Sequence, residues 1–388
     1  MLRYLMAGES HGKALTAILE GIPAGLEILE EEINIDLARR QKGYGRGGRM
    51  KIETDKTEIL NGVRWKKSLG HPITLIIRNK DWENWIEKMD PQGEMTEELK
   101  EILITKPRPG HADLTGYLKY NQYDIRNILE YASARNSAIR VAVGGICKKL
   151  LKEFGIEIFS YVTEIGGIKA DYENMTYEEI LNTIDEEKLK TPDKKAEEKM
   201  IEKIREAKEK GNTVGGVFEV VATGLPVGLG TYTHWDKRLD GRLAQSFMSI
   251  QAIKGVEIGL GFENARRLGS EVHDEIFYDA KKGYYRKENN AGGLEGGMSN
   301  GEDIVVKAAM KPIPTLYTPL KSVDVNTKEP FEASVERSDA SAVPAASVIG
   351  EAVMAYELAK AFLEKFGGDS MTEIRNNYNS YMKHINKK

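Results

Sequence analysis

The chain has 388 residues, of which 40% are hydrophobic and 30% are charged, a composition typical of a soluble globular protein. Its net charge of −4 gives no overall attraction to nucleic acids or anionic membranes, so any binding of a polyanion must come from local clusters. The single cysteine, Cys147, excludes an internal disulfide and a cysteine-based zinc site, and no apolar stretch reaches the length of a membrane span. We therefore expect a cytoplasmic protein without a membrane partner.

The first part of the chain is predicted to alternate strands and helices. Apolar spacing predicts a strand at residues 2–7, whereas residues 14–21 fit either a strand or a short helix. A helix is expected at 31–41, because acids come first and arginines last, as the helix dipole favours. The further elements expected here are strands at 50–54 and 71–79, a loop at 106–116 that its prolines and glycines keep irregular, and a helix over about 125–154.

Residues 172–211 differ from their surroundings, because they carry two charged amphipathic patterns. We interpret them as a solvated helical excursion rather than a partner site. The elements predicted beyond them are a strand within 215–230, a helix at 236–255, a glycine-rich loop at 289–301, a strand at 303–315, a long apolar helix at 342–368 and an exposed helix at 371–388. No internal repeat or low-complexity linker divides the chain, so we expect one domain over residues 1–388, with the charged helical excursion at about 172–211.

Residues 8–12 match G-x-S-x-G, the pattern around the nucleophilic serine of many hydrolases. That motif needs a strand, a sharp turn and a helix, together with an oxyanion hole and a downstream acid and histidine. Ser10 follows the first predicted strand, no HGGG-type stretch is present, and nothing singles out a histidine such as His273 as the base. A serine hydrolase that uses Ser10 is therefore an unfavoured hypothesis.

A basic, glycine-rich loop follows the predicted helix at 31–41. Residues 43–48 match G-x-G-x-x-G, but the dinucleotide fingerprint follows a strand and opens a helix, and this loop does the reverse. Glycines let the backbone approach a ligand, and arginines suit phosphate and carboxylate. We favour the hypothesis that this loop binds a small, multiply charged anion. A nucleic-acid site would be expected to contain several aromatic residues, and a loop that is merely solvated is the remaining alternative. The basic residues are Arg39, Arg40, Lys42, Arg46, Arg49 and Lys51.

Three other loops place an arginine near a histidine or an acid. They contribute Arg108 with His111, Arg135, and Arg337 with Asp339. Each of these residues also has a purely structural alternative. His111 could form a hydrogen bond within its own loop, Arg135 could pair with an acid in the core, and Asp339 could cap a helix. Taken together, the loops predict a site in which arginines bind phosphate and a histidine donates the proton that helps phosphate to leave.

Several long segments resemble the chorismate synthase family. Residues 8–23, 130–146 and 337–352 are similar to its three signature segments, and further matches follow in the same order at 39–53, 108–113, 249–262, 289–301 and 310–316. The resemblance runs from about residue 3 to residue 368. It implies an α+β fold, a β-α-β sandwich in which long helices pack between two antiparallel sheets.

The resemblance also implies a reaction. Chorismate synthases convert 5-enolpyruvylshikimate 3-phosphate to chorismate and phosphate by an anti 1,4-elimination, the last step of the shikimate pathway. They require reduced FMN, which lends an electron transiently while phosphate leaves. In such a flavin enzyme the protein positions the cofactor and supplies charge and protons.

The matching positions imply roles for individual residues. His11 would be the acid that assists the departure of phosphate, so the G-x-S-x-G match is accidental. His111 would protonate or stabilise the reduced flavin, and Asp339 would relay the ring proton, with Ser10 orienting that relay. The substrate would be bound by Arg40, Arg46, Arg49, Arg108, Arg135 and Arg337.

The resemblance further implies positions that bind nucleotides. Those that match the FMN contacts of the family are Tyr131, Ala132, Ser133, Gln251, Ala252, Gly296, Lys311, Pro312, Ile313, Pro314, Thr315 and Arg337. Arg40 and Arg46 match its NADP positions. Tyr131 and Asn136 stand where many members have arginine and glutamate, which bears on the affinity for FMN rather than on the reaction.

Members of the family are usually homotetramers with active sites near subunit contacts. Some also reduce their own flavin with NADPH, but this chain shows no additional reductase domain. We therefore expect a monofunctional homotetramer that depends on an external flavin reductant, with NADPH acting only indirectly, and with no nucleic-acid partner.

Overall fold

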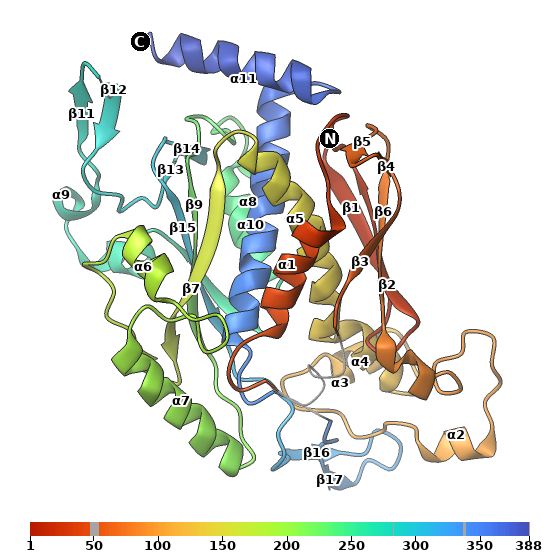
Figure 1. Ribbon diagram of the computed structural model, residues 1–388. Helices are drawn as coiled ribbons and strands as arrows, with labels where there is room; N and C mark the ends of the chain where they lie inside the picture. Colours follow the sequence, from red (N-terminus) through yellow and green to blue (C-terminus); the bar gives the residue numbers. More distant parts are fainter. Residues whose placement is uncertain (47–53, 282, 337–338, 388) are drawn as a thin grey trace.

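The computed structural model describes residues 1–46, 54–281, 283–336 and 339–387 (Figure 1). Two of the expected substrate arginines, Arg49 and Arg337, lie outside the described residues, and so does nearly all of the strand predicted at 50–54. Within the described ranges, no helix is both long enough and apolar enough to cross a membrane.

Two antiparallel sheets form the outer layers of the molecule (Figure 1). The four-stranded sheet has the order β1 (Arg3–Ala7), β2 (Ala14–Glu20), β6 (Ile73–Arg78) and β3 (Thr57–Asn61). The five-stranded sheet has the order β10 (Ile253–Ile258), β15 (Ile304–Met310), β9 (Gly216–Thr223), β7 (Glu157–Ile165) and β8 (Ile168–Lys169). Residues 14–21, which fitted two structures, form a strand because alternate side chains such as Leu15, Ala17 and Leu19 are buried.

Four helices fill the space between the sheets: α1 (Glu30–Gln41), α5 (Ser137–Lys152), α8 (Leu239–Met248) and α10 (Val343–Phe366). Helix α5 packs on β2 and β6 of the first sheet, and α10 packs on β7 and β9 of the second (Figure 1). The two helices also pack against each other, so the layers run sheet, helices, sheet. The α+β sandwich expected from the resemblance is confirmed.

Helices α5 and α10 approach so closely that one crossing point has room only for glycine. A Cβ atom added to Gly144 would lie 2.5 Å from the Cα atom of Ala352, which is shorter than any ordinary contact. The small residues that the sequence places along both helices therefore serve close packing.

Replacing Gly144 with alanine is expected to lower the free energy of unfolding by about 1–3 kcal/mol, because the added methyl group must push two packed helices apart. Denaturant unfolding would measure the change. The matched control is Gly241→Ala in α8, where the added Cβ meets nothing within 4 Å. There the higher helix propensity of alanine should raise stability by about 0.5–1 kcal/mol. Equal effects of the two substitutions would contradict this account of the crossing.

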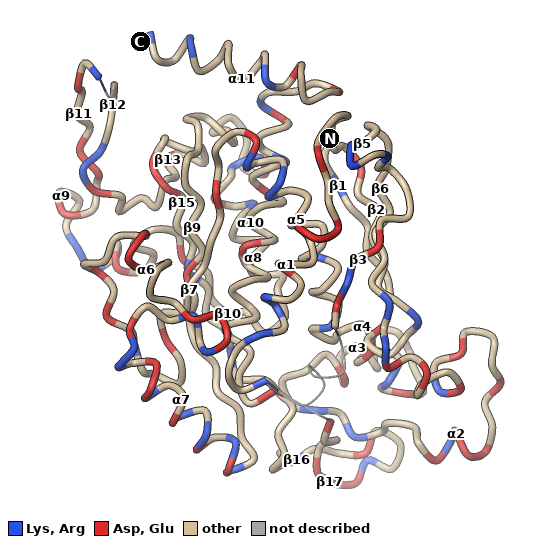
Figure 2. Tube along the Cα trace, in the orientation of Figure 1, with Lys and Arg blue, Asp and Glu red and all other residues tan. Residues whose placement is uncertain are grey.

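The structure corrects four local predictions. The helix predicted at 236–255 is shorter, because α8 ends at Met248 and the strand β10 begins at Ile253. The helix predicted over 125–154 is interrupted, because α4 (Arg126–Ala132) ends at Ser133 and a 3₁₀ turn (Ala134–Asn136) precedes α5. The loop predicted at 106–116 is shorter, because α3 (Asp113–Lys119) begins within it. Residues 172–211 form α6 (Tyr177–Thr183) and α7 (Lys194–Glu209), whose charges of both signs lie along the surface in Figure 2. Their connection is not solvated throughout, because Lys190 and Thr191 are buried.

The remaining elements are short, apart from the C-terminal helix. The 3₁₀ turns described are Lys80–Asn84, Trp235–Lys237 and Gly261–Arg266. The helices and strands are β4 (Val63–Arg64), β5 (Lys67–Ser68), α2 (Glu97–Glu101), α9 (Gly269–Val272), β11 (Ile276–Asp279), β12 (Gly283–Arg286), β13 (Leu294–Glu295), β14 (Met298–Ser299), β16 (Lys321–Val323), β17 (Pro330–Glu332) and α11 (Met371–Ile385).

A buried carboxylate on α10 ties the helix layer to the five-stranded sheet. Glu351 is fully buried, and its oxygens accept from Arg39 at 2.7 and 2.8 Å and from Lys148 at 2.6 Å. Lys190 lies 3.2 Å from it, and the hydroxyl of Ser160 on β7 donates to it at 2.6 Å. Burial alone would raise the pKa of Glu351, but the three cations hold that pKa well below its ordinary value. Because Arg39 is the neighbour of Arg40, this cluster also fixes the end of α1 at the candidate site.

Candidate active site

Ser10 and His11 lie in the turn between β1 and β2, against the end of α4. The backbone N–H of Ser10 donates to the carbonyl of Glu130 at 2.9 Å, and the backbone N–H of His11 donates to the carboxylate of Glu130 at 2.8 Å. The Nδ1 atom of His11 is 2.9 Å from both carboxylate oxygens. Because this turn joins two strands rather than a strand and a helix, it is not a nucleophile elbow, and the serine hydrolase hypothesis loses its structural basis.

The carboxylate of Glu130 is nearly inaccessible to solvent and lies between His11 and the guanidinium group of Arg126. Burial alone would raise the pKa of Glu130, but the hydrogen bonds from His11 and the charge of Arg126 lower it. Arg126 Nη1 lies 3.1 Å from the same carboxylate. The ring of Trp85 stacks on His11, with centroids 4.0 Å apart and planes at 28°. His11 is thus held at a buried anion and against an aromatic face.

Two of the expected substrate arginines converge on one buried acid. Asp55 accepts from Nη2 of Arg40 at 2.5 Å and from Nη1 of Arg135. Both arginines and the acid are buried, so the alternative that Arg135 pairs with a core acid is confirmed. Burial would raise the pKa of Asp55, but the two guanidinium groups lower it. Two guanidinium groups thus bond to the same buried carboxylate, and the buried Nε of Arg40 has no hydrogen-bond partner among the described residues.

The histidine turn and the arginine pair form one continuous network. The amide group of Asn79 accepts from Arg135 at 3.0 and 2.8 Å and donates to the carbonyl of Gly12 at 2.7 Å. The hydroxyl of Ser133 donates to that of Ser10 at 3.2 Å and accepts from the backbone N–H of Arg135. His11 and the arginines are therefore positioned by the same few polar groups.

Arg108 and His111 lie together at the start of α3. Nε of Arg108 donates to Asp113 at 2.8 Å, and Nδ1 of His111 lies 2.5 Å from the same carboxylate. Nη1 of Arg108 donates to the hydroxyl of Thr315 at 2.9 Å, which connects this loop to the expected FMN segment at 311–315. The alternative that His111 bonds within its own loop is therefore also confirmed.

Acid should destabilise the protein through Asp113. Burial alone would raise its pKa, but hydrogen bonds from His111 and Arg108 lower it below the ordinary 3.8. A depressed folded-state pKa contributes stability that is full above about pH 4 and is lost as the pH falls toward the folded value. We expect the denaturation midpoint to drop as the pH falls below about 4. An Asp113→Asn variant that showed the same drop would assign the loss to other groups.

The expected FMN positions at the ends of β10 and β15 are brought together. The backbone N–H of Lys311 donates to the carbonyl of Ala252 at 2.9 Å, and its ammonium group donates to the carbonyl of Gly110. Ala252 has a φ of 67°, a left-handed conformation that is unfavourable for alanine. Oε1 of Gln251 is buried without a hydrogen-bond partner among the described residues. Strain and an unsatisfied buried acceptor are typical of a binding site.

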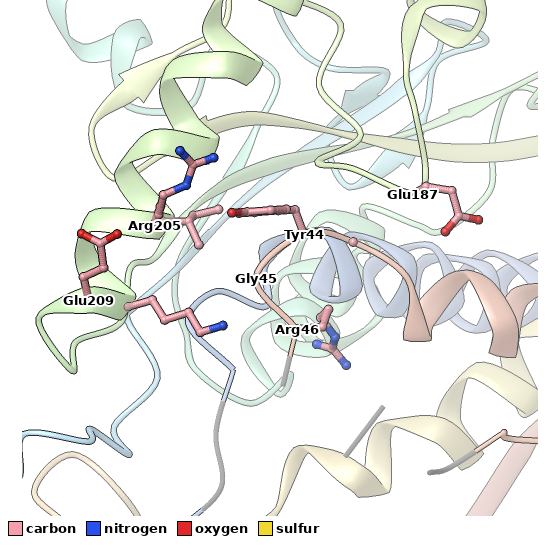
Figure 3. A pocket seen from close by; sticks show the side chains of 9 residues that line it. Tyr44, Gly45, Arg46, Glu187, Arg205 and Glu209 are labelled. Carbon is pink, nitrogen blue, oxygen red and sulfur yellow. The ribbon is translucent and has the colours of Figure 1, made fainter. Parts of the chain in front are cut away.

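Asp339 pairs with Arg46 rather than with a helix terminus. The two side chains lie 2.8 Å apart, and the residue before α10 is Ala342, which makes no side-chain cap, so the capping alternative is wrong. The charge of Arg46 also acts on Arg40, whose pKa is lowered first by burial. Arg46 further lines a cavity of about 650 Å³ between the loop after α1 and helix α7, and the ring of Tyr44 extends toward α7 there (Figure 3).

Gly296 lies apart from the expected FMN positions at the ends of β10 and β15. It connects β13 and β14, which precede the first residue of β15, whereas Lys311 follows the last. Seven residues of strand separate the two ends by about 20 Å.

Tyr131 is 48% exposed at the end of α4, and its carbonyl accepts from the buried amide of Asn136 at 2.6 Å.

Four residues of this site were missed by sequence reasoning: Asp55, Asn79, Trp85 and Glu130. Glu130 belongs to the quoted segment 130–146, and Asn79 ends the predicted strand at 71–79, where a polar residue after a buried run is a usable signal. Asp55 and Trp85 lie in segments with no local pattern. A lone acid or tryptophan has many structural uses, and only the fold shows which side chain it faces.

Comparison with known proteins identifies the family. The chorismate synthase family model matches residues 2–363. A chorismate synthase from Geobacter sulfurreducens is 60% identical and one from Aquifex aeolicus is 58% identical, with alignments covering 99% of this chain and 99% and 98% of those proteins. A crystal structure of chorismate synthase, 48% identical, covers 100% of this chain and 99% of its own with a TM-score of 0.80. The chain therefore belongs to the chorismate synthase family of phosphate-eliminating lyases.

Proposed function

We propose that this chain eliminates phosphate from 5-enolpyruvylshikimate 3-phosphate to give chorismate, by an anti 1,4-elimination that requires reduced FMN and ends the shikimate pathway. One observation carries the proposal beyond family membership. A histidine held by a buried carboxylate is connected, through Ser10, Ser133 and Asn79, to two arginines that both bond to Asp55. A proton donor therefore lies beside a positively charged anion site.

The arginines bind the substrate through its charges. The substrate carries a phosphate and two carboxylates, and guanidinium groups recognise such oxyanions with paired hydrogen bonds. Arg40 and Arg135 are oriented by Asp55, and the buried Nε of Arg40 provides a donor that is free for a ligand. Arg46 and Arg108 add further positive charge to this substrate site, and we assign Arg49 and Arg337 to the same site.

Proton transfer is divided among the two histidines and Asp339. Because Nδ1 of His11 faces Glu130, Nε2 is the atom that donates to the departing phosphate. His111 is held by Asp113 and supplies a proton to the reduced cofactor. Asp339 accepts the ring proton that leaves in the elimination, with Ser10 orienting the transfer.

The residues at the ends of β10 and β15 fit FMN. Reduced FMN, when bound, supplies an electron transiently to the reaction. The unsatisfied Oε1 of Gln251 can accept from the ring, and the ammonium group of Lys311 supplies a positive charge that compensates for the arginine that many relatives carry at the position of Tyr131. The strained turn at Ala252 and the segment 311–315 complete the FMN-binding set, with Tyr131 to Ser133 on the side of α4.

Gly296 requires a different explanation. Because β15 separates it from Lys311 by about 20 Å, we propose that it contacts the FMN of a neighbouring subunit in a homotetramer. We also propose a monofunctional enzyme that receives reduced flavin from an external source, with Arg40 and Arg46 serving the substrate rather than NADP. Anaerobic turnover with NADPH and oxidised FMN alone would contradict that view.

An anaerobic assay tests the function directly. Purified protein is mixed with 5-enolpyruvylshikimate 3-phosphate and chemically reduced FMN, and the absorbance of chorismate and the release of phosphate are followed together. Equal amounts of both products, formed only with reduced flavin and lost on admitting air, are expected. Folded protein that binds FMN but forms neither product would overturn the proposal and direct attention to Tyr131 and Asn136.

A further inference from the structure

The imidazole of His11 is restrained by side chains from two other segments. Glu130, near the end of α4, bonds to both the backbone N–H and Nδ1 of His11, at 2.8 and 2.9 Å. Trp85, just after the 3₁₀ turn at 80–84, covers the ring face at a centroid distance of 4.0 Å. His11 is only 9% exposed, so these contacts surround most of the side chain.

We propose that Glu130 and Trp85 are positioning residues for His11: the carboxylate keeps a proton on Nδ1 and turns Nε2 toward the substrate, and the indole fixes the plane of the ring. The inference rests on the proposed role of His11 as the acid that assists phosphate departure. Neither residue needs to touch the substrate for this function.

The carboxylate geometry explains why one orientation of the ring is preferred. Nδ1 lies equally close to both oxygens of Glu130, and the backbone N–H of the same histidine already bonds to one of them. Turning the ring over would replace Nδ1 by a carbon atom and would leave the buried carboxylate without that donor. An ionised carboxylate only accepts, so the nitrogen facing it must carry the proton.

Arg126 joins the two positioning residues. Its Nη1 lies 3.1 Å from Glu130, and its guanidinium carbon lies 4.9 Å from the centre of the Trp85 ring. The cation keeps Glu130 ionised and orders the indole through a cation–π contact. The other charged groups facing this assembly are Glu336, 3.9 Å from Arg126, and Lys88 and Asp81, which both contact Trp85.

A purely structural role for Glu130 would predict a different outcome on substitution. Glu130→Gln keeps the shape but replaces the carboxylate with an amide that can bond to either form of the imidazole. A structural role would lower stability and leave the protonation behaviour of His11 unchanged. A positioning role changes which ring nitrogen carries the proton and how activity depends on pH.

The first measurement is made without substrate. ¹⁵N NMR of protein labelled at its six histidines, with His11→Ala used to assign the signal, reports the protonated ring nitrogen of His11. At a pH where the ring is neutral, we expect wild type to carry its one proton on Nδ1 and Glu130→Gln to show a mixture of both neutral forms. The proton that Nε2 donates to phosphate is then the second one, which the ring carries in its doubly protonated form. A pure Nδ1-protonated signal in Glu130→Gln would overturn the proposal for Glu130, whatever reaction the protein catalyses.

The second measurement uses the anaerobic assay. Glu130→Gln is expected to lower kcat at least tenfold with KM changed less than threefold, and to move the high-pH limb of activity about one unit lower, the equivalent of tenfold in protonation. Glu130→Asp should recover part of kcat. Trp85→Leu should lower kcat about tenfold, and Trp85→Phe, which keeps a stacking ring, should stay near wild type.

Glu219→Gln is the matched control. Glu219 is a buried carboxylate on β9 that accepts from Tyr161 and Tyr172, and it takes no part in the candidate site. Its substitution should lower stability without moving the pH profile. Wild-type kcat and pH profile in both Glu130→Gln and Trp85→Leu would overturn the proposal. Full activity of His11→Ala would instead overturn the proposed acid role, which the NMR result does not depend on.

Discussion

His11→Ala is expected to lower kcat by about 10²–10⁴-fold, the usual contribution of a positioned general acid, while FMN binding is retained. The side chain lies in the turn between β1 and β2, and the hydrogen bond between this turn and an expected flavin position, Ser133, is made by Ser10 and not by His11. Its loss should therefore remove a proton donor and leave the flavin positions in place. Stopped-flow detection of chorismate and a titration with reduced FMN would measure the two quantities separately.

The matched control for this substitution is His71→Ala, since His71 is an exposed histidine in the turn before β6. It should leave both turnover and flavin binding unchanged. A His11→Ala variant that turned over at the wild-type rate would remove His11 from the mechanism, and loss of FMN binding would show that its role is structural.

Glu351→Gln is expected to lower the free energy of unfolding by about 3–5 kcal/mol, the cost of leaving buried charges without their partner. Arg39, Lys148 and Lys190 all contact this carboxylate in the interior, and a neutral amide cannot balance them. Chemical denaturation monitored by circular dichroism would give the change. The loss should shrink as the pH falls below about 4, because the unfolded chain then takes up a proton at this carboxyl while the folded protein does not.

A second substitution separates charge from packing. If unbalanced cations cause the loss, adding Lys148→Met to Glu351→Gln should recover part of the stability, because one buried charge is then removed as well. Glu58→Gln removes an acid from an exposed pair with Arg78 and should change stability very little. A double variant less stable than the sum of the single effects would contradict this explanation.

Regular elements could be predicted where burial alternates along the chain. β1, β6, β9 and α10 follow from apolar spacing alone. The break between α4 and α5 did not follow, because residues 133–136 have helical composition and are turned by contacts with Ser10 and Asp55, which are distant in sequence. The burial of Lys190 could not be predicted either, because nothing in a charged stretch indicates that one of its lysines pairs with a buried glutamate on α10.

The residues of the candidate site likewise fall into those that the sequence predicts and those that only the fold shows. Its arginines and histidines could be predicted, because such residues on glycine- or proline-rich loops suggest anion binding and the family resemblance supplied their roles. The acids that orient them, Asp55 and Glu130, could not, because the pairing joins residues 80 and 119 positions apart. A single sequence shows the histidine and the acid but not that they are in contact, because the contact depends on how the β1–β2 turn packs against α4.

The crossing of α5 and α10 at Gly144 has a consequence for the chemistry as well as for stability. Both helices start at the candidate site, α5 directly after Arg135 and Asn136, and α10 shortly after Asp339. The crossing lies about 10 Å along one helix and about 14 Å along the other from those starting points. Because the two backbones are in direct contact there, the crossing fixes the angle between the helices and thereby the distance between Arg135 and Asp339 at their starting points.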